Sequence, residues 1–281
     1  MLPPPFSALH IGVNQVAPDR YVDPPRALRG AENDARALAL RSSAAGLTPM
    51  TLTGLAATRA HVLAQLEVAA AAHPPGALFV LSFSGHGAQD VDRLSMHPGD
   101  ELDGLDEVWC LADDFLLDDE LYATLARFAP GVRILILADS CHSGDSFEAL
   151  GHDPGDTGSL CARDYPREAA RRSLGARAEE LQARAAAAAT RPPVRASVIL
   201  LAACASEGLA FEDGDHGVFT TAFCKLWDSD TRLGHRAFVE ALSVACPAQT
   251  PVYQFIAPED EAFADQRPLT AAPPLTSQTE A

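Results

Sequence analysis

Six short segments rich in aliphatic and β-branched residues recur along the chain, separated by stretches with helical patterns. Several of them, such as 77–84 (ALFVLSFS) and 133–140 (RILILADS), are apolar through their length instead of alternating between apolar and polar. A strand with this pattern is covered on both faces, as in a mostly parallel sheet flanked by helices. The predicted strands are 8–14, 50–54, 77–84, 133–140, 196–204 and 251–257.

Helical patterns lie between these strands, at 31–45, 57–72, 118–128, 216–227 and 235–245. This alternation predicts one α/β domain of the doubly wound type over residues 1–265. An Arg/Ala-rich insertion at about 145–195 lacks a clear apolar stripe, so we expect a mobile flap there. The polar, proline-containing residues 266–281 are expected to form a disordered tail.

Composition excludes several classes of protein. The net charge of -17 disfavours nucleic acid as a partner and favours a cationic substrate. No segment approaches the roughly 18 to 20 continuous apolar residues of a membrane helix, and the first residues do not resemble a secretory signal, so we expect a cytoplasmic protein. The six cysteines show no spacing typical of disulfides or structural zinc, and no phosphate-binding glycine motif indicates an organic cofactor.

Two strands end in residues that can carry chemistry. His86 follows the third predicted strand within the glycine turn SGHG, and Cys141 follows the fourth within ADSCHSG. Because ligands bind at the carboxyl ends of strands in such sheets, both side chains are expected in one crevice. A thiol attacks a carbonyl as thiolate, and histidine is suited to take its proton at neutral pH. The pair therefore predicts amide hydrolysis through a thioester.

Each of these residues also has a purely structural interpretation. Alone, a cysteine at a strand end usually serves packing, and a histidine between glycines often serves a turn; together they favour catalysis. His142 is the poorer base because neighbours in an extended segment point to opposite faces. Cys204 has no glycine-flanked partner and is interpreted as a core residue. A cysteine phosphatase is excluded because Phe147 stands where its phosphate-binding arginine would be.

The two motifs FVLSFSGHGAQD (79–90) and ILILADSCHSGDS (134–146) resemble those of the metacaspases, caspase-like cysteine peptidases of clan CD, family C14, in their bacterial form. Further segments resemble the family in consistent order over roughly residues 7 to 257: ALHIGVNQ, ALRGAENDARAL, GDELDGLDEVWCLADD, LDDELYATL and QTPVYQF. The resemblance implies the caspase-like (caspase-hemoglobinase) sandwich, with a mostly parallel six-stranded sheet flanked by helices. It also implies a monomer.

The resemblance assigns roles to individual residues. It implies His86 as base, Cys141 as nucleophile, and the backbone N–H groups of Gly87 and Cys141 as oxyanion hole. It also implies an acidic primary pocket of Asp34, Ser84 and Asp139 that selects Arg or Lys before the scissile bond. Independent of the resemblance, a carboxylate buried beside the cysteine is costly unless a cation pairs with it, and arginine does so bidentately.

Many metacaspases need calcium, and the resemblance implies a site at the acidic loop and the following helix. The expected ligands are Glu101, Asp103, Asp118 and Asp119, which offer the hard oxygens that calcium prefers. The alternative interpretation is a solvated acidic loop that begins a helix, where acidic residues favour the helix dipole.

The insertion suggests regulation. An arginine-specific peptidase that carries Arg163, Arg167, Arg171, Arg172, Arg177 and Arg184 in one segment could cut itself there, and we hypothesise that a cut within 160–195 frees the cleft. Three functions stay open: an endopeptidase for proteins with exposed Arg or Lys, a peptidase of different specificity, and a catalytically silent caspase-like scaffold.

Overall fold

The computed structural model describes residues 6–91, 105–141, 160–190, 192–205, 208–257 and 260–271, and its main feature is a six-stranded sheet. The strand order is β12-β9-β7-β3-β1-β2; all neighbours pair in parallel except β12, which runs antiparallel to β9. These strands are β1 (Ala8–Gly12), β2 (Pro49–Thr53), β3 (Leu78–Ser84), β7 (Arg133–Asp139), β9 (Ser197–Ala202) and β12 (Val252–Ala257). The predicted mostly parallel sheet is confirmed.

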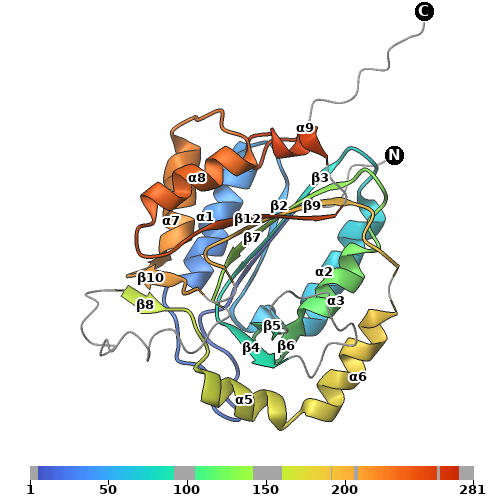
Figure 1. The fold of residues 1–281 in the computed structure, drawn as a ribbon, viewed down its shortest axis with the longest axis vertical. Coiled ribbons are helices and arrows are strands. Elements are labelled where there is room, and N and C mark those ends of the chain that lie inside the picture. The colour runs from blue at the N-terminus through green and yellow to red at the C-terminus, as the bar shows by residue number, and fades with distance from the viewer. Residues whose placement is uncertain are drawn as a thin grey trace, which may run out of the picture.

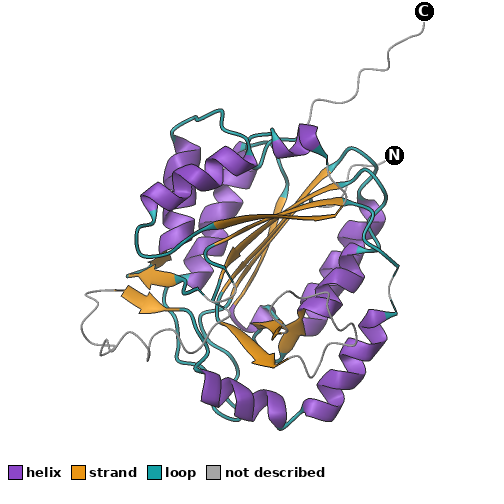
Figure 2. Ribbon diagram, viewed as in Figure 1, coloured by secondary structure: helices purple, strands orange, loops and turns teal. Residues whose placement is uncertain are grey.

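Helices cover both faces of this sheet (Figures 1 and 2). On one face lie α1 (Ala31–Ala44), α7 (Val218–Asp228) and α8 (His235–Ala245); on the other lie α2 (Arg59–Ala72) and α3 (Asp118–Leu125). A short 3-10 helix, η1 (Gly54–Ala56), precedes α2, and α9 (Glu261–Ala264) follows β12. The five predicted helices are thus found within a few residues of their expected bounds.

The two faces explain why the strands are apolar throughout. On β3, Phe79 and Leu81 pack into the cluster under α2 and α3, whereas Val80 packs into the cluster under α1, α7 and α8. Successive side chains of a strand point to opposite faces, so a strand between two helical layers needs an apolar residue at every position. Burial of both strand faces under helices therefore explains why these strands are apolar at successive positions.

Two small antiparallel sheets, which the sequence analysis did not predict, lie at the end of the main sheet where β3 and β7 finish. One contains β4 (Gly87–Val91), β5 (Leu105–Cys110) and β6 (Phe115–Leu117); the other contains β8 (Leu160–Ala162), β10 (Phe211–Asp213) and β11 (His216–Gly217). Since β4 begins directly after His86 and β8 lies in the insertion, both small sheets border the predicted crevice.

The described part of the insertion is docked on the domain. It forms α5 (Arg167–Gly175) and α6 (Ala178–Ala189), whose Leu174 and Leu181 are buried in the core. Arg184 pairs with Asp114 and Glu120 across the contact with α3. Residues 145–159 of the insertion lie outside the described residues, and its expected mobility stays a prediction.

The C-terminal end of the domain lies further along the chain than the sequence indicated. Leu269 is fully buried, and the Trp227 indole donates a 3.1 Å hydrogen bond to the carbonyl of Pro268, so residues 266–271 pack on the domain. Residues 272–281 of the predicted tail lie outside the described residues. Within the described ranges, no helix is both long enough and apolar enough to cross a membrane.

Candidate active site

The two predicted catalytic residues emerge from neighbouring strands. In the parallel pairing of β3 and β7, Ser84 lies opposite Asp139, and both strands end there. His86 and Cys141 each follow two residues later, so both side chains start from the same edge of the sheet. The two residues thus follow neighbouring strand ends at one edge of the sheet, as expected for the carboxyl ends of adjacent parallel strands.

The ring of His86 is oriented by the backbone. Its Nε2 donates a 2.8 Å hydrogen bond to the carbonyl of Arg26, so the unprotonated nitrogen of the neutral ring is Nδ1. Nδ1 makes no hydrogen bond to the described residues. Burial lowers the pKa of His86 to about 4, although the backbone groups of Arg26 and Asp164 oppose the shift. At neutral pH the imidazole is therefore uncharged and able to accept a proton.

Cys141 is fully buried, and Ala210 holds its sulfur through two hydrogen bonds. The thiol donates to the carbonyl of Ala210 at 3.1 Å and accepts the Ala210 N–H at 2.7 Å. Burial raises the pKa of Cys141 well above its ordinary value, and the neighbouring thiol of Cys204 adds to the rise. Within the described residues no hydrogen bond joins Cys141 to His86. This arrangement holds a neutral thiol and a neutral imidazole in a closed site.

Three side chains that the sequence analysis assigned to an acidic pocket do lie together. Asp34 comes from α1, Ser84 from the end of β3 and Asp139 from the end of β7, and all three are buried. Ser84 donates a 2.8 Å hydrogen bond to Asp34, and Thr220 donates to Asp139 through its N–H (3.0 Å) and its hydroxyl (2.7 Å). The pocket is therefore built from buried, oriented carboxylates.

Gly217 and His216 close one side of this pocket. The N–H of Gly217 donates to both carboxylate oxygens of Asp34 at 3.1 Å, and His216 Nδ1 lies 3.0 Å from Asp34 Oδ1. A Cβ at residue 217 would stand 2.1 Å from Asp139 Oδ2, so only glycine lets the backbone approach this closely.

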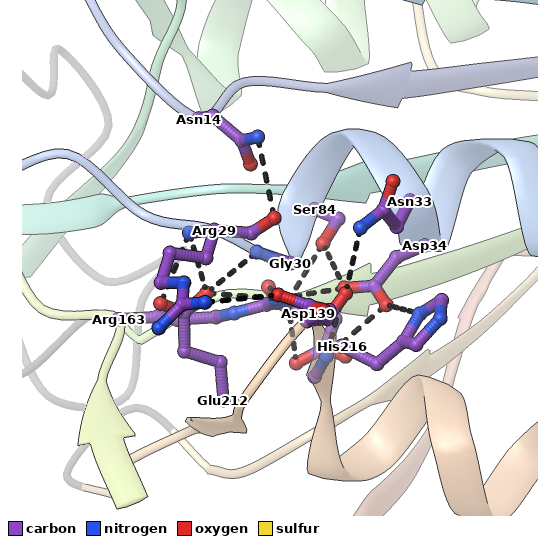
Figure 3. Close-up of polar contacts among 12 residues, drawn as sticks. Asn14, Arg29, Gly30, Asn33, Asp34, Ser84, Asp139, Arg163, Glu212 and His216 are labelled. Carbon is purple, nitrogen blue, oxygen red and sulfur yellow. Dashed lines mark hydrogen bonds and ion pairs between the residues drawn. The ribbon is translucent and has the colours of Figure 1, made fainter. Parts of the chain in front are cut away.

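The pocket is filled by an arginine of the same chain (Figure 3). Arg163 is 0 % exposed; its Nη2 lies 2.6 Å from Asp34 Oδ2 and its Nη1 lies 3.2 Å from Asp139 Oδ1. Nη1 also donates to the Ser84 hydroxyl at 2.6 Å. Arg163 is one of the six arginines expected as self-cleavage sites in the insertion, and nothing in the sequence pattern distinguishes it from the other five.

A third carboxylate, missed from the sequence, completes the pocket. Glu212 Oε2 lies 3.6 Å from Arg163 Nη2, and the carboxylate accepts the N–H groups of Arg29 (3.1 and 3.2 Å) and Gly30 (3.0 Å). Glu212 thus fixes the loop whose Arg26 carbonyl orients His86. The sequence signal for Glu212 was weak. In LAFEDGD the glutamate follows apolar residues, but it also precedes Asp and Gly, so the sequence alone does not distinguish a buried pocket residue from a turn residue.

The two aspartates that share the guanidinium have pKa values shifted in opposite directions. Burial acts to raise the pKa of Asp34, but the charge of Arg163 and hydrogen bonds from His216, Arg163 and Ser84 hold it below its ordinary value. Burial raises the pKa of Asp139 against the charge of Arg163, and the nearby charge of Asp34 adds to the rise. Two carboxylates close together favour one shared cation.

The backbone N–H of Gly87, the predicted oxyanion donor, also contacts Arg163. Its N–H donates to the carbonyl oxygen of Arg163 at 3.4 Å. The role of the Cys141 N–H stays a prediction. The catalytic and binding roles of the other residues likewise remain predictions, whereas their convergence is a property of the fold.

Only half of the predicted calcium ligands belong to the described residues. Asp118 and Asp119 occupy the first turn of α3, where Asp118 Oδ1 accepts the N–H of Asp119 at 2.7 Å. Glu101 and Asp103 lie outside the described residues. In the part of the chain that is described, no three His, Cys, Asp or Glu side chains are grouped to hold a metal ion. Asp118 and Asp119 therefore do not make a calcium site alone.

The fold and the paired strand ends define a caspase-like cysteine peptidase architecture. The family model for the caspase domain, peptidase family C14, matches residues 7–247, and the chain belongs to this family. The metacaspase resemblance and the caspase-like fold expected from the sequence are confirmed.

Similar proteins extend the comparison. The chain is 33% identical over 157 residues to Metacaspase-1B of Aspergillus fumigatus, and 41% identical over 75 residues to Metacaspase-2 of Arabidopsis thaliana. These matches cover 50% and 25% of this chain but only 36% and 17% of the relatives, so the chain spans about a third or less of their length. The crystal structure of protein GSU0716 from Geobacter sulfurreducens superposes with a TM-score of 0.78 at 35% identity, covering 94% of this chain and 98% of that one.

Proposed function

We propose that the protein is a cysteine endopeptidase that cleaves proteins after arginine, and after lysine more slowly. The observation that carries this proposal is the buried pocket of Asp34, Asp139 and Glu212, which holds a guanidinium beside Cys141. A guanidinium presents five N–H donors in a planar fork, whereas an ammonium is a compact point charge. Three carboxylates around one cation therefore suit a guanidinium better than an ammonium group.

The proposed reaction uses the Cys/His pair. Cys141 Sγ adds to the carbonyl carbon of the substrate arginine that precedes the scissile bond, while His86 Nδ1 takes the thiol proton. The Gly87 N–H stabilises the developing oxyanion. His86 then protonates the leaving amine, and water hydrolyses the thioester and restores the thiol. The hydrogen bond from Nε2 to Arg26 supports this assignment because it leaves Nδ1 as the basic nitrogen.

Calcium activation is a separate proposal. Asp118 and Asp119 would supply carboxylate oxygens and Glu101 and Asp103 would complete the ligand set. Isothermal titration of the Cys141→Ala chain with calcium, compared with Asp118→Asn/Asp119→Asn in the same background, tests binding without any need for activity. Loss of the binding heat in the double variant is expected; identical titrations would contradict the assignment.

The activity is tested with fluorogenic peptides that are identical except for a terminal Arg, Lys or Asp, using wild type and Cys141→Ala with calcium or with chelator. We expect cleavage of the Arg peptide, slower cleavage of the Lys peptide, none of the Asp peptide, and loss of all activity in the variant. Cleavage of the Asp peptide would refute the specificity. No cleavage by any active-site-intact form would favour the scaffold.

A further inference from the structure

His216 shares a carboxylate with the arginine that fills the acidic pocket. Its Nδ1 lies 3.0 Å from Asp34 Oδ1, whereas Arg163 Nη2 lies 2.6 Å from Asp34 Oδ2. The imidazole and the guanidinium lie on opposite sides of Asp34 (Figure 3). A carboxylate can accept from both because its two oxygens offer about four lone-pair sites. His216 is therefore the direct neighbour of a cation bound to Asp34.

The backbone around His216 is held against the start of α1. The N–H of Gly217 donates to both oxygens of Asp34, and β11 pairs with β10, with His216 opposite Asp213. A Cβ at Gly30 would stand 2.8 Å from the Cα of His216, so glycine at residue 30 lets β11 approach α1 this closely. These contacts keep Nδ1 of His216 beside Asp34.

His216 reaches solvent, whereas its neighbours in the pocket do not. The side chain of His216 is 45% exposed, and those of Asp34 and Arg163 are 0% exposed. Asp34 is ionised and only accepts, so Nδ1–H donates to it whether the ring is charged or not. The proton that charges the ring therefore binds Nε2. His216 can gain or lose this proton while the pocket stays buried.

Charged and titratable groups face the His216 ring from each neighbouring element. His216 lines a cavity of about 190 Å³ between α1 and α7. The groups around the ring are Asp34 and Arg41 of α1, Cys224 and Lys225 of α7, Asp213 of β10, Asp215 before β11, and Arg163 of the insertion.

The balance of these groups favours the charged ring. The hydrogen bond to Asp34 raises the pKa of His216 above its ordinary 6.5, and burial acts against this rise. The charges of Asp34 and Asp215 add to the rise, whereas the charge of Arg163 lowers the pKa. A guanidinium in the pocket and a proton on His216 thus oppose each other.

We propose that His216 is a specificity-determining residue, and that binding of a cationic side chain in the acidic pocket is coupled to loss of a proton from His216. This inference rests on the proposed arginine-directed activity. The uncharged ring leaves the negative charge of Asp34 to the substrate, whereas the protonated ring places a second positive charge beside the guanidinium. Binding linkage is reciprocal, so the proton and the guanidinium weaken each other's binding by the same factor. The affinity for arginine should therefore rise with pH as His216 loses its proton.

The first test measures KM and kcat for the arginine peptide between about pH 6 and pH 9 in wild type, His216→Asn and His61→Asn. The asparagine amide can donate to Asp34 in place of Nδ1–H but does not titrate. His61 is the matched control because it is an exposed histidine on α2, which covers the opposite face of the sheet. The substrate guanidinium stays charged throughout this range.

We expect KM to fall about tenfold as the pH rises in wild type and in His61→Asn, the factor that corresponds to one unit of difference in the His216 pKa. In His216→Asn, KM should be independent of pH and close to the high-pH value of wild type. The pH profile of kcat, which reports the reaction at Cys141, should be the same in all three. A KM that falls equally in His216→Asn would overturn the inference.

A second measurement needs no catalysis. Isothermal titration of the Cys141→Ala/Arg163→Met chain with N-acetyl-arginine amide, in buffers of different ionisation heat, reports the protons released on binding. We expect proton release and about tenfold tighter binding at high pH, and loss of both effects when His216→Asn is added. Equal proton release with and without His216 would overturn the inference. Arg163→Gln replaces Arg163→Met if the latter does not fold.

The two proposals fail differently. Hydrolysis of the arginine peptide with a KM that does not depend on His216 overturns the coupling and leaves the proposed function standing. Proton-coupled binding of N-acetyl-arginine amide without hydrolysis by any form overturns the peptidase and supports the role of His216 in the pocket. Absence of both hydrolysis and binding overturns both.

Discussion

The ion pair between Arg163 and Asp34 should be among the strongest in the protein, and a double-mutant cycle measures it. At 2.6 Å and an effective dielectric constant of about 20, the attraction is about 6 kcal/mol before desolvation is subtracted. Breaking a buried pair costs about 3 to 5 kcal/mol, and Asp139 and Glu212 remain near the cation, so we expect a coupling of about 3 kcal/mol. The variants are Asp34→Asn, Arg163→Met and both together.

Urea unfolding of the four chains, all carrying Cys141→Ala to prevent self-cleavage, gives the coupling. Asp34→Asn alone should destabilise the fold because Arg163 loses a partner, yet in the Arg163→Met chain it should stabilise the fold because one uncompensated carboxylate is removed. The control is Arg172 with Asp23, which lie at nearly the same separation, 2.5 Å, with side chains 55% and 47% exposed. Water screens that pair, so its coupling should lie within experimental error. An Asp34–Arg163 coupling as small as the control would refute the buried ion pair.

Three further predictions concern pH, the nucleophile and specificity. Burial acts to raise the pKa of Glu120, but Arg184 and Arg59 hold it below its ordinary 4.5; its stabilising contribution is thus complete above pH 4.5 and lost as the pH falls through the folded pKa. Arg184→Gln should flatten the loss of stability seen by urea unfolding between roughly pH 5 and pH 3; an unchanged slope would contradict this. Cys141→Ala should reduce peptide hydrolysis by roughly 10⁴-fold or more, while Cys204→Ala, a core change, should keep at least half of it; the reverse order would exchange their roles. Glu212→Gln should lower kcat/KM for the arginine peptide by about tenfold and leave kcat/KM for lysine nearer to wild type, and equal losses would show that Glu212 does not read the guanidinium.

The main sheet and its helices were predictable because burial imposes a period on the sequence. Strands such as 133–140 lie between two helical layers and are apolar at successive positions, which few other environments require. The small sheets were not predictable in this way. Strands of two or three residues, such as β10 and β11, carry too few positions for a period to appear, and long-range pairing determines them.

The convergence of His86 with Cys141 followed from topology, since neighbouring parallel strands deliver their last residues to one edge. Asp34, Ser84 and Asp139 followed from the family resemblance, and the structure brings them together. The identity of the pocket's occupant did not follow from either. A helix-prone, arginine-rich insertion contains several equivalent cations, and only the pairing of β8 with β10 selects one of them.

The buried acidic pocket links the stability of the fold to the proposed activity, because both depend on a cation beside the same carboxylates. Three carboxylates without a cation would carry a desolvation cost that a marginally stable domain tolerates poorly. Arg163 offsets that cost in the folded chain, and under the proposed function a substrate arginine would offset it during catalysis. When the pocket is empty, protonation of one aspartate, favoured at Asp139 by its raised pKa, lowers the cost instead. A chain whose pocket is empty, such as Arg163→Met, should therefore be less stable than wild type, and arginine-terminated peptides should restore part of the difference.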